Sequence, residues 1–311
     1  MARRRYIRIR FSDGVVRKVP LIEPMRPTDT EEIPRHGWIA ERKLDGSLTL
    51  MYLIDGAVAY VNRRGTNKTD IYPELTDDEP KKIKTKGLTI IQGEVYEGSG
   101  GVGTFEDFLR RDLLQDPEEA RRRQKRYPLK FGAFDILNKN NQWVVNKDLL
   151  ERRKILESTI PKGVEVKVVS YSKNPEKFTK EEKKGGISEG IVLKKIGTPY
   201  TYGKSKNWRK LKFKKEADTV VLGYVKGKGK REGIGTLRVG VYDSKTHKVR
   251  EVAKVGTGFT DEELADLKRK IDSGKKVFAK VEYMKVGSRG RLRAPVFVGE
   301  REDIAVKETH L

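Results

Sequence analysis

The sequence predicts an α+β domain over residues 1–215, followed by an all-β domain over residues 216–311. Two observations indicate this organisation. At 311 residues the chain is long enough for two domains that each bury a core of their own. Strand-like runs alternate with capped helix patterns in the first part, whereas almost only strand patterns follow the basic stretch at 204–215.

The first domain is predicted to be mostly sheet. Residues 6–11 alternate between apolar and polar side chains, turn at Ser12-Asp13-Gly14 and resume at Val15, which is the pattern of a hairpin. Further strands are expected between residues 38 and 62, with a break at Asp55-Gly56, and between residues 87 and 96.

Four helices should interrupt this sheet, because residues that favour helix N-termini precede amphipathic patterns. Their expected starts are Thr104 with Asp107 three residues on, Asp116 before Pro117, Asn146 before the periodic stretch 149–160, and Asn174 before Pro175.

The second domain should contain five strands and one helix. The strands are expected at 219–226, 234–243, 247–255, 276–286 and 291–299. The helix should begin at Thr260, which forms a capping box with Glu263, and should end at Ser273-Gly274. This pattern matches a small Greek-key barrel of the OB type. The basic, glycine-rich stretch 226–231 is predicted to be a loop that can touch phosphates.

The charge and the composition narrow the class of partner. A net charge of +23 indicates a polyanionic partner. Nucleic acid is the expected partner and an anionic membrane surface the alternative, and no apolar run is long enough to span a bilayer. The basic N-terminus lacks the apolar core of a secretory signal, so a cytosolic protein is expected. The chain has no cysteine and three scattered histidines, so any metal should be a hard ion held by carboxylates.

The run ERKLDGSL at 41–48 has the residues that covalent nucleotide transfer needs. Lys43 would lie between two strands, where its amine could act as a nucleophile. Asp45 could accept a hydrogen bond from a ribose, and Gly46 would let a ligand approach the backbone closely. Taken alone, this short pattern also fits an ordinary surface hairpin turn.

Other strand-end segments offer groups that bind a nucleotide. Arg63 and Arg64, in NRRG at 62–65, offer fork-shaped donors for ribose or phosphate. Phe134, in FGAFDIL at 131–137, can stack on a purine. Solvated charges after a strand and a core phenylalanine are the alternative interpretations.

Two acids and two lysines complete this set. Glu94, in QGEVYEG at 92–98, and Glu189, in SEGIVLK at 188–194, can hold Mg²⁺. Lys210 and Lys212, in WRKLKFK at 208–214, share one face of a strand and can point at one phosphate. Surface glutamates and a solvated basic face are the alternatives.

In this order the segments resemble the motifs of the nucleotidyltransferase superfamily of ATP-dependent DNA ligases, RNA ligases and mRNA-capping enzymes. They are most similar to those of small ATP-dependent DNA ligases, and the resemblance extends from about Trp38 to Asp303. The stretches 220–233 and 254–264 resemble DNA ligases more than capping enzymes and most RNA ligases. The resemblance therefore implies an adenylation domain at 1–215 and an OB-fold domain at 216–311.

The resemblance also implies a reaction. Lys43 would attack the α-phosphate of ATP, AMP would pass to the 5′-phosphate of a nick in duplex DNA, and a 3′-hydroxyl would then displace AMP and seal the strand. Mg²⁺ would assist, and the protein would be a monomer in the cytoplasm, on a nucleoid or at a viral replication site. The implied contacts are Glu41 with the adenine side, Asp45 and Glu94 with the ribose or a metal-bound water, Phe134 with the base face, Glu189 with the metal, Lys210 and Lys212 with the α-phosphate, and Arg301 with the pyrophosphate.

Two positions depart from the DNA-ligase pattern. Leu48 stands where these enzymes usually carry an arginine, and KLDGSL is closer to RNA ligases; Arg63 or Arg64 could supply the missing contact. Ile304, after Arg301-Glu302-Asp303, stands where a lysine is expected. An RNA ligase or capping-type transferase, and a non-catalytic nucleic-acid-binding protein, therefore remain alternatives.

Overall fold

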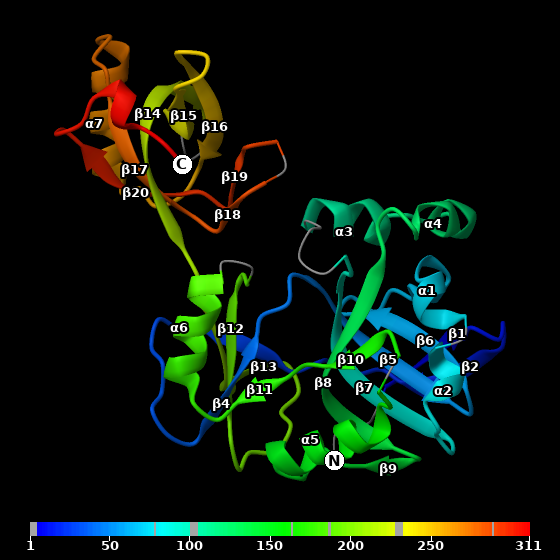
Figure 1. The fold of residues 1–311 in the computed structure, drawn as a ribbon. Helices are drawn as coiled ribbons and strands as arrows, with labels where there is room; N and C mark the ends of the chain where they lie inside the picture. Colours follow the sequence, from blue (N-terminus) through cyan, green and yellow to red (C-terminus); the bar gives the residue numbers. More distant parts are fainter. Residues whose placement is uncertain are drawn as a thin grey trace. The chain divides into compact units, whose positions relative to one another are not determined.

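The chain divides into two compact units, Met1–Lys212 and Phe213–Leu311 (Figure 1). This division comes from a computed structural model that describes residues 5–77, 79–99, 105–162, 164–185, 188–227, 233–287 and 289–311.

The first unit contains a six-stranded sheet with the order β10-β8-β7-β5-β6, in which β9 pairs with the far end of β8. All pairs are antiparallel except β10 with β8. The strands are β5 (Gly46–Ile54), β6 (Ala57–Asn62), β7 (Leu88–Glu97), β8 (Leu129–Lys139), β9 (Gln142–Trp143) and β10 (Val166–Val168). The predicted break at Asp55-Gly56 is confirmed, since β5 and β6 form a hairpin there.

A five-stranded sheet and a separate hairpin complete the strands of this unit. The sheet has the order β11-β4-β12-β13-β3, and only β13 and β3 run parallel. Its strands are β3 (Arg26–Asp29), β4 (Trp38–Arg42), β11 (Tyr171–Ser172), β12 (Gly190–Lys195) and β13 (Lys204–Lys212). The predicted N-terminal hairpin is confirmed as β1 (Tyr6–Arg10) paired with β2 (Val16–Pro20).

The α-helices described in the first unit have between four and eleven residues. They are α1 (Pro73–Thr76), α2 (Glu79–Lys82), α3 (Phe105–Asp112), α4 (Pro117–Arg123), α5 (Leu149–Thr159) and α6 (Pro175–Gly185), and a 3₁₀ turn (Thr69–Ile71) precedes them. Asp116 caps α4 as expected, whereas Thr104 lies outside the described residues.

The expected start of α5 at Asn146 is wrong, because the N-cap is Asp148. The Asp148 carboxylate accepts hydrogen bonds from the N–H groups of Leu150 and Glu151, and the Glu151 carboxylate accepts from the Asp148 N–H. This capping box satisfies three amide donors and so fixes the start two residues later.

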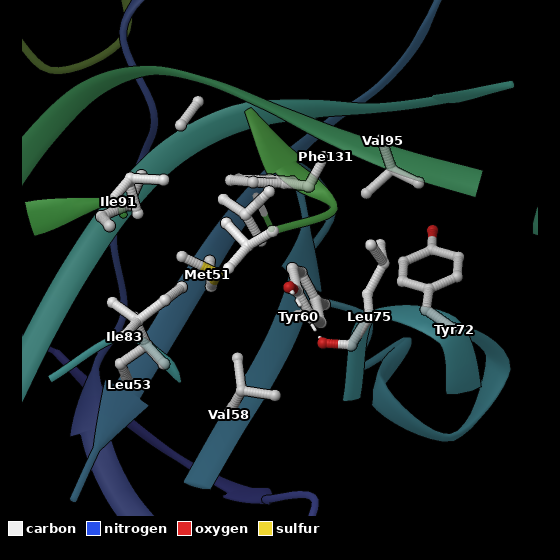
Figure 2. Close-up of a cluster of buried hydrophobic side chains, with 14 of the residues drawn as sticks. Met51, Leu53, Val58, Tyr60, Tyr72, Leu75, Ile83, Ile91, Val95 and Phe131 are labelled. Atoms are coloured by element: carbon white, nitrogen blue, oxygen red, sulfur yellow. Dashed lines mark hydrogen bonds between the residues drawn. The ribbon is translucent and has the colours of Figure 1, made fainter. Parts of the chain in front are cut away.

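Strand alternation divides the apolar side chains of the six-stranded sheet between two cores. On one face, Met51 and Leu53 of β5 pack with Tyr60 of β6 and Phe131 of β8 (Figure 2). On the other face, even-numbered residues of β5 pack with Trp208 of β13 and with Phe11 and Val19 beside the hairpin. The second core therefore joins both sheets and the hairpin.

The second unit contains a five-stranded antiparallel sheet with the order β16-β15-β14-β17-β20. The strands are β14 (Lys215–Lys226), β15 (Ile234–Asp243), β16 (Lys248–Val255), β17 (Phe278–Tyr283) and β20 (Val296–Arg301), with a small pair β18 (Lys285–Val286) and β19 (Leu292–Arg293). The one α-helix among its described residues is α7 (Asp261–Asp272), which has the predicted capping box of Thr260 and Glu263. A 3₁₀ turn (Val306–Glu308) follows β20.

The expected closed barrel is not formed by the described strands, because no ladder joins the edge strands β16 and β20. One backbone hydrogen bond, from the Phe297 N–H to the Thr257 carbonyl at 2.9 Å, lies where closure would begin. Directly afterwards the chain turns at Gly258, which has φ +98°, and a Cβ there would lie 2.2 Å from the Phe297 carbonyl oxygen. The turn leads the chain into α7, so the ladder cannot continue.

Two further expectations concern membrane-spanning segments and the glycine-rich loop. No helix within the described residues is long and apolar enough to cross a membrane. Most of the glycine-rich loop at 226–231 lies outside the described residues, so its contact with phosphates stays a prediction.

Candidate active site

A cavity of about 370 Å³ lies in the first unit, and both sheets contribute to its walls. Most of its charged side chains are cationic, which favours an anionic ligand. The charged residues in the lining are Arg26, Arg42, Lys43, Arg63, Lys194, Lys204 and Lys210 against Glu41 and Glu94. Apolar contacts come from Met25, Pro27, Leu44, Leu48, Phe134, Val192 and Trp208.

Lys43 lies between β4 and β5, as predicted, and its side chain lines the cavity. Its backbone N–H donates to the Gly190 carbonyl at 3.0 Å, which fixes the segment against β12. Its ammonium Nζ lies 2.5 Å from Glu189 Oε2, and 20% of the Lys43 side chain is exposed. A partly exposed amine on a fixed backbone can reach a ligand in the cavity.

Gly46 has a structural role beside Lys43. It pairs with Tyr96 at the start of the β5–β7 ladder, and a Cβ at Gly46 would lie 1.9 Å from the Val95 carbonyl oxygen. Close packing against β7 therefore requires a glycine here. The close approach to the Gly46 backbone that we expected of a ligand is made by the neighbouring strand β7.

Glu94 extends from β7 directly opposite Leu48 and lines the cavity. Burial raises the pKa of Glu94 to about 8, the Lys43 ammonium opposes this shift, and the negative charges of Glu189 and Asp45 add to it. Three carboxyl groups therefore interact around one lysine. A divalent cation would offset their mutual repulsion.

The two predicted metal ligands suit a Mg²⁺ ion that takes only a few of its ligands from the protein. Glu94 and Glu189 supply the oxygen ligands that Mg²⁺ prefers. No group of three or more acidic or histidine side chains suited to a metal is present in the described part of the chain. Two carboxylates suffice for Mg²⁺ because it usually keeps several waters and binds substrate phosphates.

Glu41 lines the cavity and is otherwise buried, with 2% of its surface exposed. Its carboxylate pairs with Arg153 Nη1 and Lys194 Nζ, both at 2.6 Å. The Lys194 Nζ also lies 4.5 Å from the centre of the Phe134 ring and 4.2 Å from that of Trp208. Burial lowers the pKa of Lys194, and the charge of Glu41 opposes this shift.

Sequence reasoning missed Lys194, Trp208 and Arg153. The signal for Lys194 was present, because it lies two residues after Val192 on one strand and so shares the cavity face. Trp208 shares a face with Lys210 in the same way. Arg153 comes from a helix, and no spacing in the sequence relates it to Glu41.

The two lysines of β13 lie in different positions. Lys210 lines the cavity, and its Nζ is 3.4 Å from Asp29 Oδ1. Lys212 does not line this cavity, although it lies opposite Gly190 in the β12–β13 ladder, next to Glu189.

A second cavity of about 630 Å³ adjoins the first, because Leu48, Arg63 and Glu94 line both. The Arg63 N–H donates to the Leu48 carbonyl at 3.0 Å, whereas Arg64 lines only the second cavity. The remaining lining is Gly46, Ser47, Asn62, Thr66, Lys68, Phe105, Phe108, Leu109, Asp112 and Leu113. Arg63 is therefore the arginine that borders both spaces.

Arg301 belongs to the second unit, at the end of β20. Its guanidinium is held by Asp303 at 2.9 Å and by Asp218 at 3.1 Å. The hydrogen bond with Asp303 raises the pKa of Arg301 above its ordinary value, so this side chain stays charged.

Family models match most of the chain. Residues 22–212 match the model described as ATP dependent DNA ligase domain, and residues 230–277 match the one described as ATP dependent DNA ligase C terminal region.

Relatives with similar sequences include DNA ligase 2 of Thermofilum pendens and a DNA ligase of Nitrosopumilus maritimus. The first is 32% identical over 269 residues, which are 78% of this chain and 44% of the relative. The second is 30% identical over 275 residues, which are 80% of this chain and 46% of the relative. The chain spans about half the length of the curated relatives it matches.

Solved structures show a similar fold. One, described as "DNA binding with a minimal scaffold: Structure-function analysis of Lig E DNA ligases", aligns with a TM-score of 0.62 and 21% identity over 90% of this chain and 100% of its own. Another, "mycobacterial DNA ligase D complexed with ATP and MES", aligns with a TM-score of 0.55 and 22% identity over 93% and 98%.

Proposed function

Since the chain belongs to the ATP-dependent DNA ligase family, we propose that it seals nicks in duplex DNA that carry a 5′-phosphate and a 3′-hydroxyl. The reaction proceeds through AMP bound covalently to Lys43 and then through an adenylated DNA 5′ end. The observation that carries this proposal is the position of Lys43, a partly exposed amine in a cationic cavity beside two carboxyl groups.

In the first step, the Lys43 Nζ attacks the α-phosphorus of ATP. A nitrogen–phosphorus bond forms, the bond from the α-phosphorus to the pyrophosphate oxygen breaks, and pyrophosphate leaves. The ion pair of Lys43 with Glu189 must open first, because only the neutral amine has a lone pair to attack with. Glu189 would then be free to hold Mg²⁺, and the ammonium proton passes to solvent, which reaches this partly exposed side chain.

The cavity residues hold and orient the nucleotide. Phe134 contacts the base face and Glu41 the adenine side, where Lys194 fixes the Glu41 carboxylate. Lys210 offsets the charge that develops on the α-phosphate from the cavity wall, and Lys212 does so from its position beside Glu189. Asp45 contacts the ribose or a metal-bound water. Positioning and charge neutralisation supply most of the rate in such a step.

Glu94 and Glu189 would hold Mg²⁺, which shields the charge of the triphosphate when bound. The raised pKa of Glu94 supports this assignment, since a half-buried carboxylate near two other acids is stabilised by a cation. Arg301 of the second unit contacts the pyrophosphate, as the motif resemblance implies.

The second cavity is proposed to receive the nicked end. Arg63 lines both cavities, so it can contact the nucleotide and then the 5′-phosphate that accepts AMP. Arg64 contacts the DNA from the second cavity alone. In the last step a 3′-hydroxyl attacks the activated phosphate and AMP leaves.

The domain assignment follows from this function. We propose that residues 1–215 form the adenylation domain and residues 216–311 an OB-fold domain, whose strand order supports that architecture. The partner is nicked duplex DNA, the protein acts as a monomer, and it works where DNA lies, in the cytoplasm, on a nucleoid or at a viral replication site.

An RNA ligase or capping-type transferase with the same lysine is the alternative suggested by Leu48. It is not favoured, because both family models and the relatives above carry the name DNA ligase. Arg63 beside Leu48 also offers the cation that Leu48 lacks.

Labelled ATP, GTP and NAD, each supplied with Mg²⁺ and with nicked DNA or nicked RNA, separate these functions. We expect a covalent adduct with ATP only and sealing of the DNA nick. Sealing of RNA alone, or a guanylylated protein, would favour the alternative. A protein that forms no adduct with any nucleotide would be a non-catalytic nucleic-acid-binding protein.

A further inference from the structure

The N-terminal hairpin β1–β2 precedes the matched part of the family, which begins at residue 22. Its inner face is fixed to the first unit by Ile9 and Val19, which are buried in the core that joins the two sheets. Backbone contacts add to this anchor, because the Ser12 N–H donates to the Val58 carbonyl of β6 at 2.8 Å. The hairpin is therefore a fixed platform beside β6 (Figure 1).

The outer face of the hairpin is basic and exposed. Tyr6, Arg8 and Arg10 alternate along β1 toward solvent, and Lys18 of β2 lies directly opposite Arg8. The Lys18 Nζ lies 5.1 Å from the centre of the Tyr6 ring, which is 51% exposed. We call these four residues the basic strip.

The cations of the basic strip have no ion-pair partner among the described residues. The single acid between residues 5 and 21 is Asp13, and its carboxylate is taken by Arg17 at 2.7 and 2.5 Å in the hairpin turn. Like charges opposite each other in an antiparallel pair repel, so Arg8 and Lys18 destabilise the hairpin they lie on. A polyanion laid across the strip would relieve that repulsion.

The basic strip begins beside the second cavity. The Asn67 side-chain amide donates to the Arg10 carbonyl at 2.8 Å. Asn67 ends the turn that carries Arg63 and Arg64, which line that cavity. A duplex whose end occupies the second cavity would thus find further cations on the adjoining hairpin.

We propose that the basic strip contacts the phosphate backbone of duplex DNA next to the nick. The inference rests on the proposed function and adds a binding surface outside the family's matched region. Phosphate contacts of this kind give affinity and orientation without sequence preference.

The test is a triple variant, Arg8→Gln, Arg10→Gln and Lys18→Gln, in the full chain. Its binding to a nicked duplex with a 3′-dideoxy end, which cannot be sealed, is followed by fluorescence anisotropy between 50 and 200 mM salt. The contact between Asn67 and the Arg10 backbone is kept, because the change affects only side chains.

The matched control lowers the net charge by the same three units elsewhere on the first unit. It changes three exposed lysines that have no ion pair with a described residue: Lys154, Lys162 and Lys173, each to Gln.

Each phosphate contact contributes about 0.9 to the slope of log K against log salt, so loss of three contacts lowers the slope by about 2.7. Over a fourfold range of salt, wild-type affinity should therefore fall roughly 40-fold more than that of the hairpin variant. The control should keep the wild-type slope, and all three proteins should form the lysyl-AMP adduct at equal rates.

Equal slopes for the hairpin and control variants would overturn the inference. The inference would also be overturned if the hairpin variant bound DNA as tightly as the wild type but no longer bound anionic phospholipid vesicles. Failure of the wild-type protein to form any AMP adduct would contradict the proposed function itself, and adduct formation is measured without DNA.

Discussion

We predict that Glu94 couples the release of a proton to cation binding in the cavity. Burial raises the pKa of Glu94 to about 8, with Lys43 opposing and Glu189 adding to the shift. Such a carboxyl is ionised in about 9% of molecules at pH 7 and in about half at pH 8. Because Mg²⁺ binds the carboxylate form, its apparent affinity should rise about 5-fold from pH 7 to 8 and less than about 2-fold from pH 8 to 9.

The perturbation is Glu94→Gln, which keeps the size of the side chain and removes its titration. The half-saturating Mg²⁺ concentration for self-adenylation should then be higher and should no longer change between pH 7 and 9. Glu97→Gln is the matched control. Glu97 lies on the same strand as Glu94, and because it is three residues further along, its side chain points to the opposite face. It should keep the wild-type profile.

Calorimetry in two buffers of different ionisation enthalpy gives a second reading. At pH 7 the wild-type protein should release about 0.9 proton per Mg²⁺ bound, and Glu94→Gln close to none. A wild-type Mg²⁺ requirement that is independent of pH, or equal proton release by both proteins, would refute the reasoning.

The same pKa predicts stability in the absence of metal. The folded protein holds a proton on Glu94 more tightly than the unfolded chain does between pH 4.5 and about 8, so its stability should fall as pH rises through that window. Glu94→Gln should raise the melting temperature relative to wild type at pH 9 and not at pH 4.

Three other substitutions test the packing and the chemistry of the site. Arg152→Leu removes the partner that lies 2.8 Å from the fully buried Asp135. In urea denaturation it should lower the free energy of unfolding by about 3–5 kcal/mol. Arg121→Leu, at an exposed ion pair, should lower it by about 1 kcal/mol or less. Unchanged stability in Arg152→Leu would contradict the burial of this pair. Phe134→Ala should weaken ATP binding about tenfold, and Phe134→Leu should weaken it less. If Phe134→Ala bound ATP as tightly as the wild type, the ring would not contact the base. Lys210→Ala should slow adenylation about 10²-fold or more at saturating ATP, and Lys210→Arg should recover part of the rate. If Lys210→Ala changed only KM, Lys210 would bind ATP in the ground state and would not stabilise the transition state.

Local signals in the sequence predicted many of the elements. Thr260 with Glu263, and Asp116 before Pro117, start helices as expected because each forms its cap within a few residues. Asn146 failed because Asp148, two residues on, is also a good cap and completes a capping box. The open sheet of the second unit was not predictable, since it depends on how the chain leaves β16 at Gly258.

The family resemblance is confirmed by the matching family models. The candidate residues of the first unit that line the cavity with Lys43 are Glu41, Arg63, Glu94, Phe134 and Lys210, whereas Lys212, which alternation puts on the same face of β13 as Lys210, does not line it. The structure adds the Glu41 pairing with Arg153 and Lys194, which joins a strand, a helix and a second strand. Such contacts depend on tertiary packing, and no sequence spacing encodes them.

The central claim is that Lys43 carries AMP. After incubation with ATP and Mg²⁺, peptide mass spectrometry should find one AMP on the peptide that contains Lys43, and pyrophosphate should release it. Lys43→Arg, which keeps the charge beside Glu189, should carry none. AMP found on another lysine, or retained by Lys43→Arg, would contradict the account.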